Sequence, residues 1–290
     1  MCGIFGVLST NRFSEPDCIK SLQSLHHRGP DSARWWSYVY NEKKFLFLGH
    51  TRLSIQDLSD LGSQPMHSSD KRYTIIFNGE IYNFRELKRG LESSGVNFTG
   101  DSDTEVVLQL FIKYGLDCVE KLSGMFAFVV LDNISGEITI ARDRFGKKPL
   151  YYYLDKNRFI FASELNAILK FKDIKSSLSI NKTSIHQILV TGFTHGQSSI
   201  FSEIKKINPS TVSVFSIKRM TFISSKRYWS LESINNASNV LLDPCQEIEH
   251  LFNSSVEQRL VSDVPICMFL SGGVDSSLVY SQALKYNPDM

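Results

Sequence analysis

The 290-residue sequence lacks any apolar stretch long enough to cross a membrane. Its longest apolar runs, residues 125–131 and 264–270, are far shorter than the ~20 residues that a membrane-spanning helix needs. The first ten residues have neither the basic nor the apolar segment of a secretory signal. Residue 2 is cysteine, whereas myristoylation requires glycine there. We therefore expect no membrane partner.

A surplus of one charge is also absent. Lysine and arginine number 32 against 30 acidic residues, for a net charge of +2. The composition therefore predicts no nucleic-acid partner. The five cysteines are odd in number and form no Cys-x-x-Cys pair, which argues against a disulfide framework and against a zinc site. These absences predict a cytoplasmic protein with one or two domains.

Short β-rich runs dominate residues 1–200, with few helices between them. Two helices are predicted. One follows Asn83, its expected cap, and the other begins at Ser102, whose Ser-Asp-Thr-Glu sequence is a capping box. Residues 207–229 again indicate strands and turns. The predicted strands before them are Gly3–Ser9, Phe45–Leu53, Tyr73–Asn78, Met125–Leu131, Glu137–Ala141, Leu150–Leu154 and Arg158–Ala162.

The character of the sequence changes after residue 229. Residues 230–239 are polar and suggest a connector, and a helix is predicted from about Pro244 to Leu260. The apolar run 264–270 then suggests a buried strand, followed by a Gly-Gly turn and another helix start. This order is half of an α/β unit.

Cys2 is the first candidate catalytic residue. Removal of Met1, which we expect because cysteine is a small second residue, would place a thiol and a free α-amine on one residue. An α-amine has a pKa of ~7.7–8, so near neutral pH it is able to accept the thiol proton. On its own, a cysteine at position 2 is more often an ordinary buried side chain.

Several further segments accompany Cys2 in the chain. They are His-Arg-Gly-Pro-Asp (27–31), Gly-His-Thr-Arg-Leu-Ser-Ile (49–55), Phe-Asn-Gly-Glu-Ile-Tyr-Asn (77–83), Gly-Asp-Ser-Asp-Thr-Glu (100–105) and Arg-Asp-Arg-Phe-Gly-Lys-Lys-Pro-Leu-Tyr-Tyr (142–152). In this order, with Met-Cys-Gly-Ile-Phe-Gly at the start, they resemble the class II glutamine amidotransferases, which are N-terminal nucleophile hydrolases. The resemblance implies an α+β fold, a four-layer αββα sandwich, and hydrolysis of glutamine to glutamate and ammonia at Cys2.

The resemblance also assigns the oxyanion donors. A tetrahedral oxyanion needs preorganised donors, and the resemblance gives this role to the Asn78 side-chain amide and the Gly79 N–H. Glycine at 79 would allow the backbone to approach the reacting carbon closely. Asn-Gly is also a common turn dipeptide, so these two residues alone would not identify the site.

Substrate binding is assigned in the same way. By resemblance, Arg52 binds the carboxylate of glutamine through its planar guanidinium, Asp103 binds the ammonium, and the backbones of Ile55 and Glu80 add contacts. Taken separately, Arg52 could be a surface ion pair, and Asp103 could simply stabilise the first turn of a helix. Three histidines, His26, His27 and His50, are expected to be structural, since the α-amine serves as the base.

A second motif follows the apolar run. Its sequence, Leu-Ser-Gly-Gly-Val-Asp-Ser-Ser (270–277), places glycines and hydroxyls before a helix start, where they suit an anionic ligand. It resembles the pyrophosphate loop of ATP pyrophosphatases, and residues 259–265 are typical of asparagine synthetases. The resemblance implies that Ser271, Gly272, Gly273, Ser276 and Ser277 hold pyrophosphate, that Leu270 lies near adenosine, and that Asp275 helps place Mg²⁺.

Together the two motifs predict a glutamine-dependent asparagine synthetase with glutamine, aspartate and ATP as substrates and ATP and Mg²⁺ as cofactors. The expected domains are residues 2–212, a connector at 213–240 and the start of an ATP-pyrophosphatase domain at 241–290. Because the family's second domain is much longer, we expect this chain to hydrolyse glutamine without completing amide synthesis. Amidation of another carboxylate, on a peptide or polysaccharide, and a glutaminase-only or non-catalytic regulatory protein remain alternatives, and a homodimer is left open.

Overall fold

A computed structural model describes residues 1–233 and 243–288. Two six-stranded sheets form its centre, and every strand pairing in them is antiparallel. In spatial order the first sheet comprises β10 (Ile204–Lys206), β8 (Tyr151–Leu154), β9 (Arg158–Ala162), β1 (Gly3–Ser9), β3 (Lys44–Arg52) and β2 (Ser32–Tyr40). The second comprises β12 (Thr221–Arg227), β11 (Thr211–Ser216), β7 (Glu137–Arg142), β6 (Gly124–Asp132), β5 (Tyr73–Ile81) and β4 (Met66–His67).

The two sheets pack face to face through one apolar layer. Ile4, Leu8 and Leu48 of the first sheet share a buried cluster with residues of β5, β6 and β7 of the second. At its centre the rings of Phe159 and Phe215 are stacked, with centroids 4.1 Å apart and planes 10° from parallel. Since Phe159 lies on β9 and Phe215 on β11, this pair joins the sheets directly.

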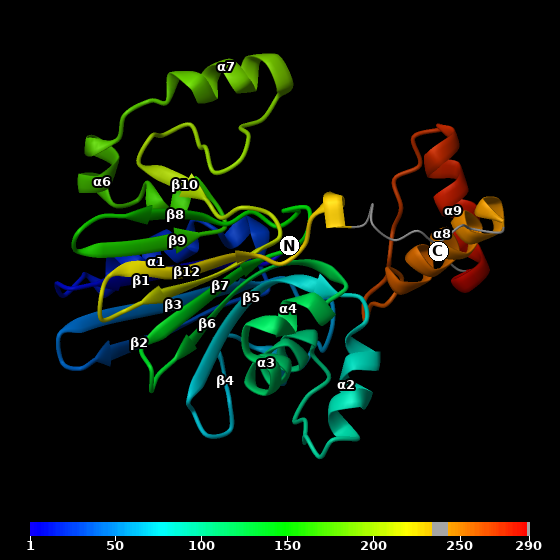
Figure 1. Cartoon of the computed structure of the whole chain (residues 1–290), viewed down its shortest axis with the longest axis horizontal. Coiled ribbons are helices and arrows are strands. Elements are labelled where there is room, and N and C mark those ends of the chain that lie inside the picture. The colour runs from blue at the N-terminus through cyan, green and yellow to red at the C-terminus, as the bar shows by residue number, and fades with distance from the viewer. Residues whose placement is uncertain (234–242, 289–290) are drawn as a thin grey trace.

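Helices cover both outer faces (Figure 1). A second cluster buries the first sheet against α1 (Glu15–Gln23), α5 (Leu165–Ile168) and α6 (Lys172–Ser177). A third buries the second sheet against α2 (Phe84–Glu92), α3 (Asp103–Tyr114) and α4 (Cys118–Lys121). The expected αββα arrangement is therefore confirmed. The remaining helix of this part is α7 (Lys182–Thr191), and short 3-10 turns lie at His26–Arg28, Asp60–Gly62, Gly115–Asp117 and Leu231–Ser233.

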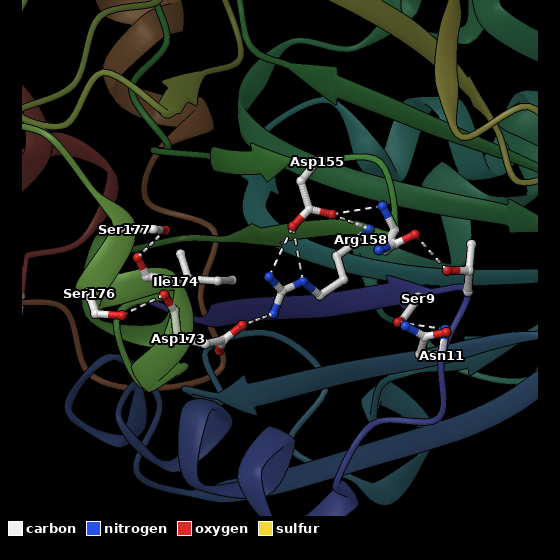
Figure 2. A network of polar contacts seen from close by, with 10 residues as sticks. Ser9, Asn11, Asp155, Arg158, Asp173, Ile174, Ser176 and Ser177 are labelled. Atoms are coloured by element: carbon white, nitrogen blue, oxygen red, sulfur yellow. Dashed lines mark hydrogen bonds and ion pairs between the residues drawn. The ribbon is translucent and has the colours of Figure 1, made fainter.

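An arginine on β9 ties α6 to the first sheet (Figure 2). Nε and Nη2 of Arg158 donate to Oδ2 of Asp155 at 3.1 and 3.0 Å, while Nη1 donates to Asp173 on α6. Oδ1 of Asp155 also accepts from the N–H groups of Asn157 and Arg158, which shapes the turn between β8 and β9. The network therefore links α6 to the β8–β9 hairpin.

All seven strands predicted before residue 207 are present, with ends within a few residues of the expected ones. The structure also contains elements that the sequence did not predict: β2, β4 and β10, and the helices α1, α4, α5, α6 and α7. Asn83 precedes α2 as expected, but its side chain does not cap the helix: Nδ2 donates to Lys121 O, and Oδ1 accepts from Ser123 N. Ser102 does cap α3, accepting from Glu105 N at 3.3 Å.

The second part of the chain contains α8 (Pro244–Gln258) and α9 (Val274–Tyr286), which lie beside the sandwich in Figure 1. The strand predicted at 264–270 is wrong: no described residue pairs with this segment, and Phe269 is fully exposed. A strand needs a neighbour to satisfy its backbone. The predicted connector falls partly on residues 234–242, which lie outside the described residues.

The expected boundary at residue 212 falls inside β11. This strand pairs with both β7 and β12, so the second sheet extends to Arg227. We propose that the first domain ends after β12. No helix of the described residues is both long and apolar enough to span a membrane.

Replacing Phe159 by alanine should remove the stacked contact between the sheets and leave a cavity. We expect the free energy of unfolding to fall by about 3–5 kcal/mol, the range measured for buried aromatic residues replaced by alanine. Denaturant unfolding measures this change. Ile134→Ala, at a side chain that is 72% exposed, is the control and should change stability by less than about 0.5 kcal/mol. Equal stability of the two variants would contradict the proposed role of the stack.

Candidate active site

Cys2 lies where two neighbouring strands end. β1 begins at Gly3, which pairs with Thr51 near the end of β3, so Cys2 and Leu53 extend from adjacent strands. The Leu53 N–H donates to Sγ of Cys2 at 3.5 Å, and Sγ lies 3.7 Å from the Leu53 carbonyl oxygen. The antiparallel pairing of β1 and β3 therefore sets the position of the thiol.

Arg28 fixes the main chain of the same residue. Its Nε donates to the Cys2 carbonyl at 3.0 Å, and its Nη1 forms a 2.9 Å ion pair with Glu164. Gly29 lies directly against the β3 backbone: a Cβ there would lie 2.4 Å from Thr51 C and O. Glycine in the His-Arg-Gly-Pro-Asp segment is therefore required for this contact.

Two ionisable groups at the start of the chain are shifted in opposite directions. Burial raises the pKa of the Cys2 thiol, although the Leu53 hydrogen bond opposes the shift. Burial lowers the pKa of the terminal amine, which the structure places on Met1. Near neutral pH these shifts favour a neutral thiol next to a neutral amine.

A cavity opens at Cys2, and all seven residues expected for glutamine chemistry line it: Cys2, Arg52, Ile55, Asn78, Gly79, Glu80 and Asp103. They come from the start of β1, the end of β3 and the loop after it, the end of β5, and the first turn of α3. These segments are far apart in sequence. The fold brings them together because the start of β1 lies beside the ends of β3 and β5.

Asn78 has an unusual environment in this cavity. Its side chain is 1% exposed, yet neither Oδ1 nor Nδ2 has a hydrogen-bond partner among the described residues. A buried amide without partners carries a desolvation cost. This cost is explained if the amide serves a ligand in the cavity.

Gly79 is required for a different reason from the expected one. A Cβ at this position would lie 2.5 Å from the Met125 carbonyl oxygen and 2.8 Å from Phe126 Cβ on β6. Glycine here permits close packing between β5 and β6. This packing alone explains why residue 79 is glycine, without the expected close approach to the reacting carbon.

Arg52 is buried at the end of β3. Its guanidinium donates to the carbonyls of Ser59 at 2.8 Å and of Asp57. Gly62 packs against it, where a Cβ would lie 2.2 Å from Nη2. Within residues 1–233 and 243–288 no carboxylate forms an ion pair with Arg52, so its charge is available to a ligand in the cavity.

Asp103 begins α3, and its Oδ2 accepts from the Ile81 N–H at 3.0 Å. Burial raises the pKa of this carboxyl to about 7, and the nearby Glu80 charge adds to the shift. Binding a cation would reverse the shift, because an opposite charge favours the ionised form.

Four polar side chains with no role expected from the sequence also line the cavity: Gln56, Gln64, Thr104 and Lys148. Lys148 is 3% exposed, and burial lowers its pKa. Lys148 lies in segment 142–152, one of those that resemble the amidotransferases, and this is the sequence feature that could have indicated a place in the site. Gln64 donates to Thr104 at 3.0 Å and accepts from Phe77 N at 2.6 Å, so it shapes the cavity wall.

The histidines have the environments expected of structural residues. Burial lowers the pKa of His50 to about 3, and its Nε2 lies 3.1 Å from the Phe77 carbonyl oxygen, so it is neutral. His27 lies 3.0 Å from Glu164. Neither histidine lines the cavity.

The Ser-Gly-Gly loop lies apart from this cavity, at the N-terminus of α9. Gly273 is its N-cap residue without a side-chain cap, and Gly272 has φ +80, a conformation that favours glycine. Ser271 and Ser276 lie 2.9 Å apart through their hydroxyls. Uncapped N–H groups with adjacent hydroxyls form a donor set that fits a pyrophosphate.

Asp275, in the first turn of α9, is the carboxylate that could orient a magnesium ion beside this loop. The described residues hold no cluster of three or more metal-ligating side chains. The other ligands of the ion would have to be phosphate oxygens and water, as is usual for Mg²⁺. Leu270, expected near adenosine, is 56% exposed beside the loop.

The raised pKa of Asp103 predicts a pH-dependent stability. The carboxyl of an unfolded chain ionises at a pKa of ~3.9, whereas in the folded protein it ionises at about 7. The stabilisation that the bound proton gives is full below pH ~4 and is lost as the pH rises to about 7. The Tm of the wild type relative to Asp103→Asn should therefore fall between pH 4.5 and 7 and level off above. Asp60→Asn, at an exposed side chain, is the control; a constant Tm difference would contradict the assignment.

Comparison with known proteins agrees with this geometry. Residues 1–229 match the family model described as glutamine amidotransferase domain, and residues 247–289 match that of asparagine synthase. Two glutamine-hydrolyzing asparagine synthetases of Bacillus subtilis are 38% and 35% identical, over 96% and 100% of this chain. An amidase, chry2, of Gibberella zeae is 32% identical over 89%. The chain spans about half the length of the curated relatives it matches, 44% and 45% for the two synthetases.

Among solved structures, a glutamine phosphoribosylpyrophosphate amidotransferase from B. subtilis, complexed with ADP and GMP, is similar with a TM-score of 0.56. The similarity covers 98% of this chain and 64% of that one at 18% identity, so it bears on the fold alone. The fold expected from the sequence is thereby confirmed. With a domain model covering residues 1–229, the chain belongs to the glutamine amidotransferase domain family, and the start of an asparagine synthase domain follows.

Proposed function

We propose that this chain hydrolyses glutamine at Cys2 and forms part of a glutamine-dependent asparagine synthetase. The observation that carries the proposal is the cavity at Cys2, which gathers Arg52, Asn78 and Asp103 and leaves the Asn78 amide without a partner. A thiol, a neutral amide donor and two opposite charges match the reacting carbonyl, the oxyanion and the two charged groups of glutamine.

In the proposed reaction, the α-amine of Cys2, freed by removal of Met1, accepts the thiol proton as Sγ attacks the amide carbon of glutamine. Burial raises the pKa of the Cys2 thiol, so the thiol is neutral near neutral pH and needs a base when its sulfur attacks. The Asn78 amide and the Gly79 N–H would donate to the oxyanion. The amine then protonates the departing ammonia, and water hydrolyses the thioester to glutamate.

The charged groups of the substrate would take two further positions. The Arg52 guanidinium would bind the carboxylate, and the ionised Asp103 would bind the ammonium. Ile55 and Glu80 also line the cavity, which supports the backbone contacts proposed for them.

We propose that the ammonia is consumed by a synthetase half that begins after residue 241. There the β-carboxylate of aspartate would attack the α-phosphorus of ATP, releasing pyrophosphate, and ammonia would displace AMP. Ser271, Gly272, Gly273, Ser276 and Ser277 would hold the pyrophosphate at the start of α9, beside Leu270. Bound Mg²⁺ would neutralise phosphate charge, with Asp275 orienting it. The match of residues 247–289 to asparagine synthase supports this assignment.

A second acceptor is considered because of the fungal relative named an amidase, which is 32% identical over 89% of this chain. The same glutaminase could serve amidation of another carboxylate. A non-catalytic regulatory protein is disfavoured, since Cys2, Arg52, Asn78 and Asp103 all line one cavity. We further propose a cytoplasmic location, because all five cysteines are free thiols.

Replacing Cys2 by alanine should abolish the release of glutamate from glutamine, because no other residue supplies the nucleophile. A coupled glutamate assay measures the rate, and intact mass spectrometry checks that Met1 has been removed. Cys245→Ala, at an exposed cysteine on α8, should retain the wild-type rate. Glutamate release by the Cys2 variant at the wild-type rate would contradict the mechanism.

Replacing Asn78 by alanine should separate activity from stability. We expect kcat to fall ~10²–10³-fold if the amide donates to the oxyanion. Thermal stability should not fall by the cost of a lost hydrogen bond, because the amide has no partner in the free protein. Asn166→Ala, exposed on α5, is the matched control. A kcat within twofold of wild type would remove Asn78 from this role.

A further inference from the structure

Residues 259–263, which precede the apolar segment, contact the amidotransferase domain at three points. The Arg259 guanidinium lies over the Tyr82 ring, 4.4 Å from its centroid. Val261 packs against the apolar cluster on the outer face of the second sheet. Asp263 forms hydrogen bonds with the loop that follows β3. These contacts give the segment a defined position on the first domain.

Asp263 holds that loop on two sides. Its main-chain N–H donates to the Ile55 carbonyl at 2.9 Å, and its Oδ2 accepts from the Asp57 N–H at 2.7 Å. Ile55 lines the glutamine cavity, so this contact is made with a residue of the proposed substrate site. A single residue of the second part of the chain thus fixes two residues of the loop.

The same loop holds Arg52. The Asp57 carbonyl accepts from the Arg52 guanidinium, and the Asp57 carboxylate accepts from the N–H groups of Ser59 and Asp101, both at 3.1 Å. Asp57 has φ +52, a left-handed conformation that a non-glycine residue adopts only when its surroundings hold it there. The Asp263 carboxylate supplies one of these restraints, on the N–H of Asp57 itself.

We propose that Asp263 is a positioning residue for glutamine binding, acting through Asp57 on the guanidinium of Arg52. The inference rests on the proposed glutaminase function and extends it. Asp263 lies outside residues 1–229, which match the amidotransferase family, and inside residues 247–289, which match asparagine synthase. The substrate-carboxylate site of one domain is therefore completed by a residue of the next.

The test measures glutamine hydrolysis by the 290-residue chain with Asp263→Ala. We expect KM for glutamine to rise roughly three- to tenfold with kcat unchanged, the factor that loss of one ordinary hydrogen bond produces. Asp263→Asn keeps an acceptor oxygen and should restore KM to near wild type. Glu249→Ala removes a negative charge from exposed α8 and should leave both constants unchanged. A wild-type KM in Asp263→Ala, or an equal rise in the asparagine variant, would overturn the proposal.

Two further measurements separate this proposal from its premises. In an Arg52→Ala background the Asp263→Ala change should no longer lower kcat/KM, because its effect passes through Arg52; additive losses would overturn the assigned route. Alkylation of Cys2 by iodoacetamide, which needs no carboxylate site, should proceed at the wild-type rate in Asp263→Ala. If wild-type chain showed no Cys2-dependent hydrolysis, the proposed function would fail, and that result does not depend on Asp263.

Discussion

The antiparallel pairing of β1 with β3 is the constraint on which the site depends. Its register places Gly3 opposite Thr51, so the residue before β1 and the residues after β3 meet at one end of the sheet. The thiol of Cys2 and the loop that holds Arg52 are thereby neighbours. A shift of one residue would turn the side chains of β1 to the opposite face. It would break the apolar layer and the site together, so folding and site assembly are coupled.

Much of this arrangement could be predicted because the site residues lie in short, distinctive segments. Asn78-Gly79 and Ser102-Asp103 occur at element ends that the sequence marks clearly, a strand end and a capped helix. The sequence does not predict β2 because none of its residues is buried, so it lacks the alternation of buried and exposed side chains that indicates a strand. The predicted side-chain cap of α2 is absent because the Asn83 side chain instead forms a hydrogen bond with Lys121, which is distant in sequence. The local sequence around a helix start does not indicate which distant backbone groups compete for a capping side chain.

At residues 264–270 the sequence predicts an element that the structure does not contain. Its apolar sequence predicts a buried strand, yet Phe269 is fully exposed and Leu270 is 56% exposed. Hydrophobicity indicates what a segment could bury, whereas a strand also requires a neighbouring strand, which none of the described residues supplies here. The contacts between the two domains could not be predicted from the sequence either. Nothing in the sequence around Asp263 indicates that it binds the loop after β3, because loop-to-loop hydrogen bonds have no periodic signal.

The cavity contains buried polar and ionisable groups whose burial destabilises the folded protein when no ligand is bound. The Asn78 amide is buried without partners, Asp103 has a carboxyl pKa raised to about 7, and burial lowers the pKa of Lys148. Each of these is a desolvation cost in the free protein. In the proposed reaction, the ammonium of glutamine would offset the cost at Asp103 on binding, and the oxyanion would offset the cost at Asn78. Because the oxyanion forms only during the reaction, the Asn78 amide would stabilise the transition state more than bound glutamine, and such a difference accelerates a reaction.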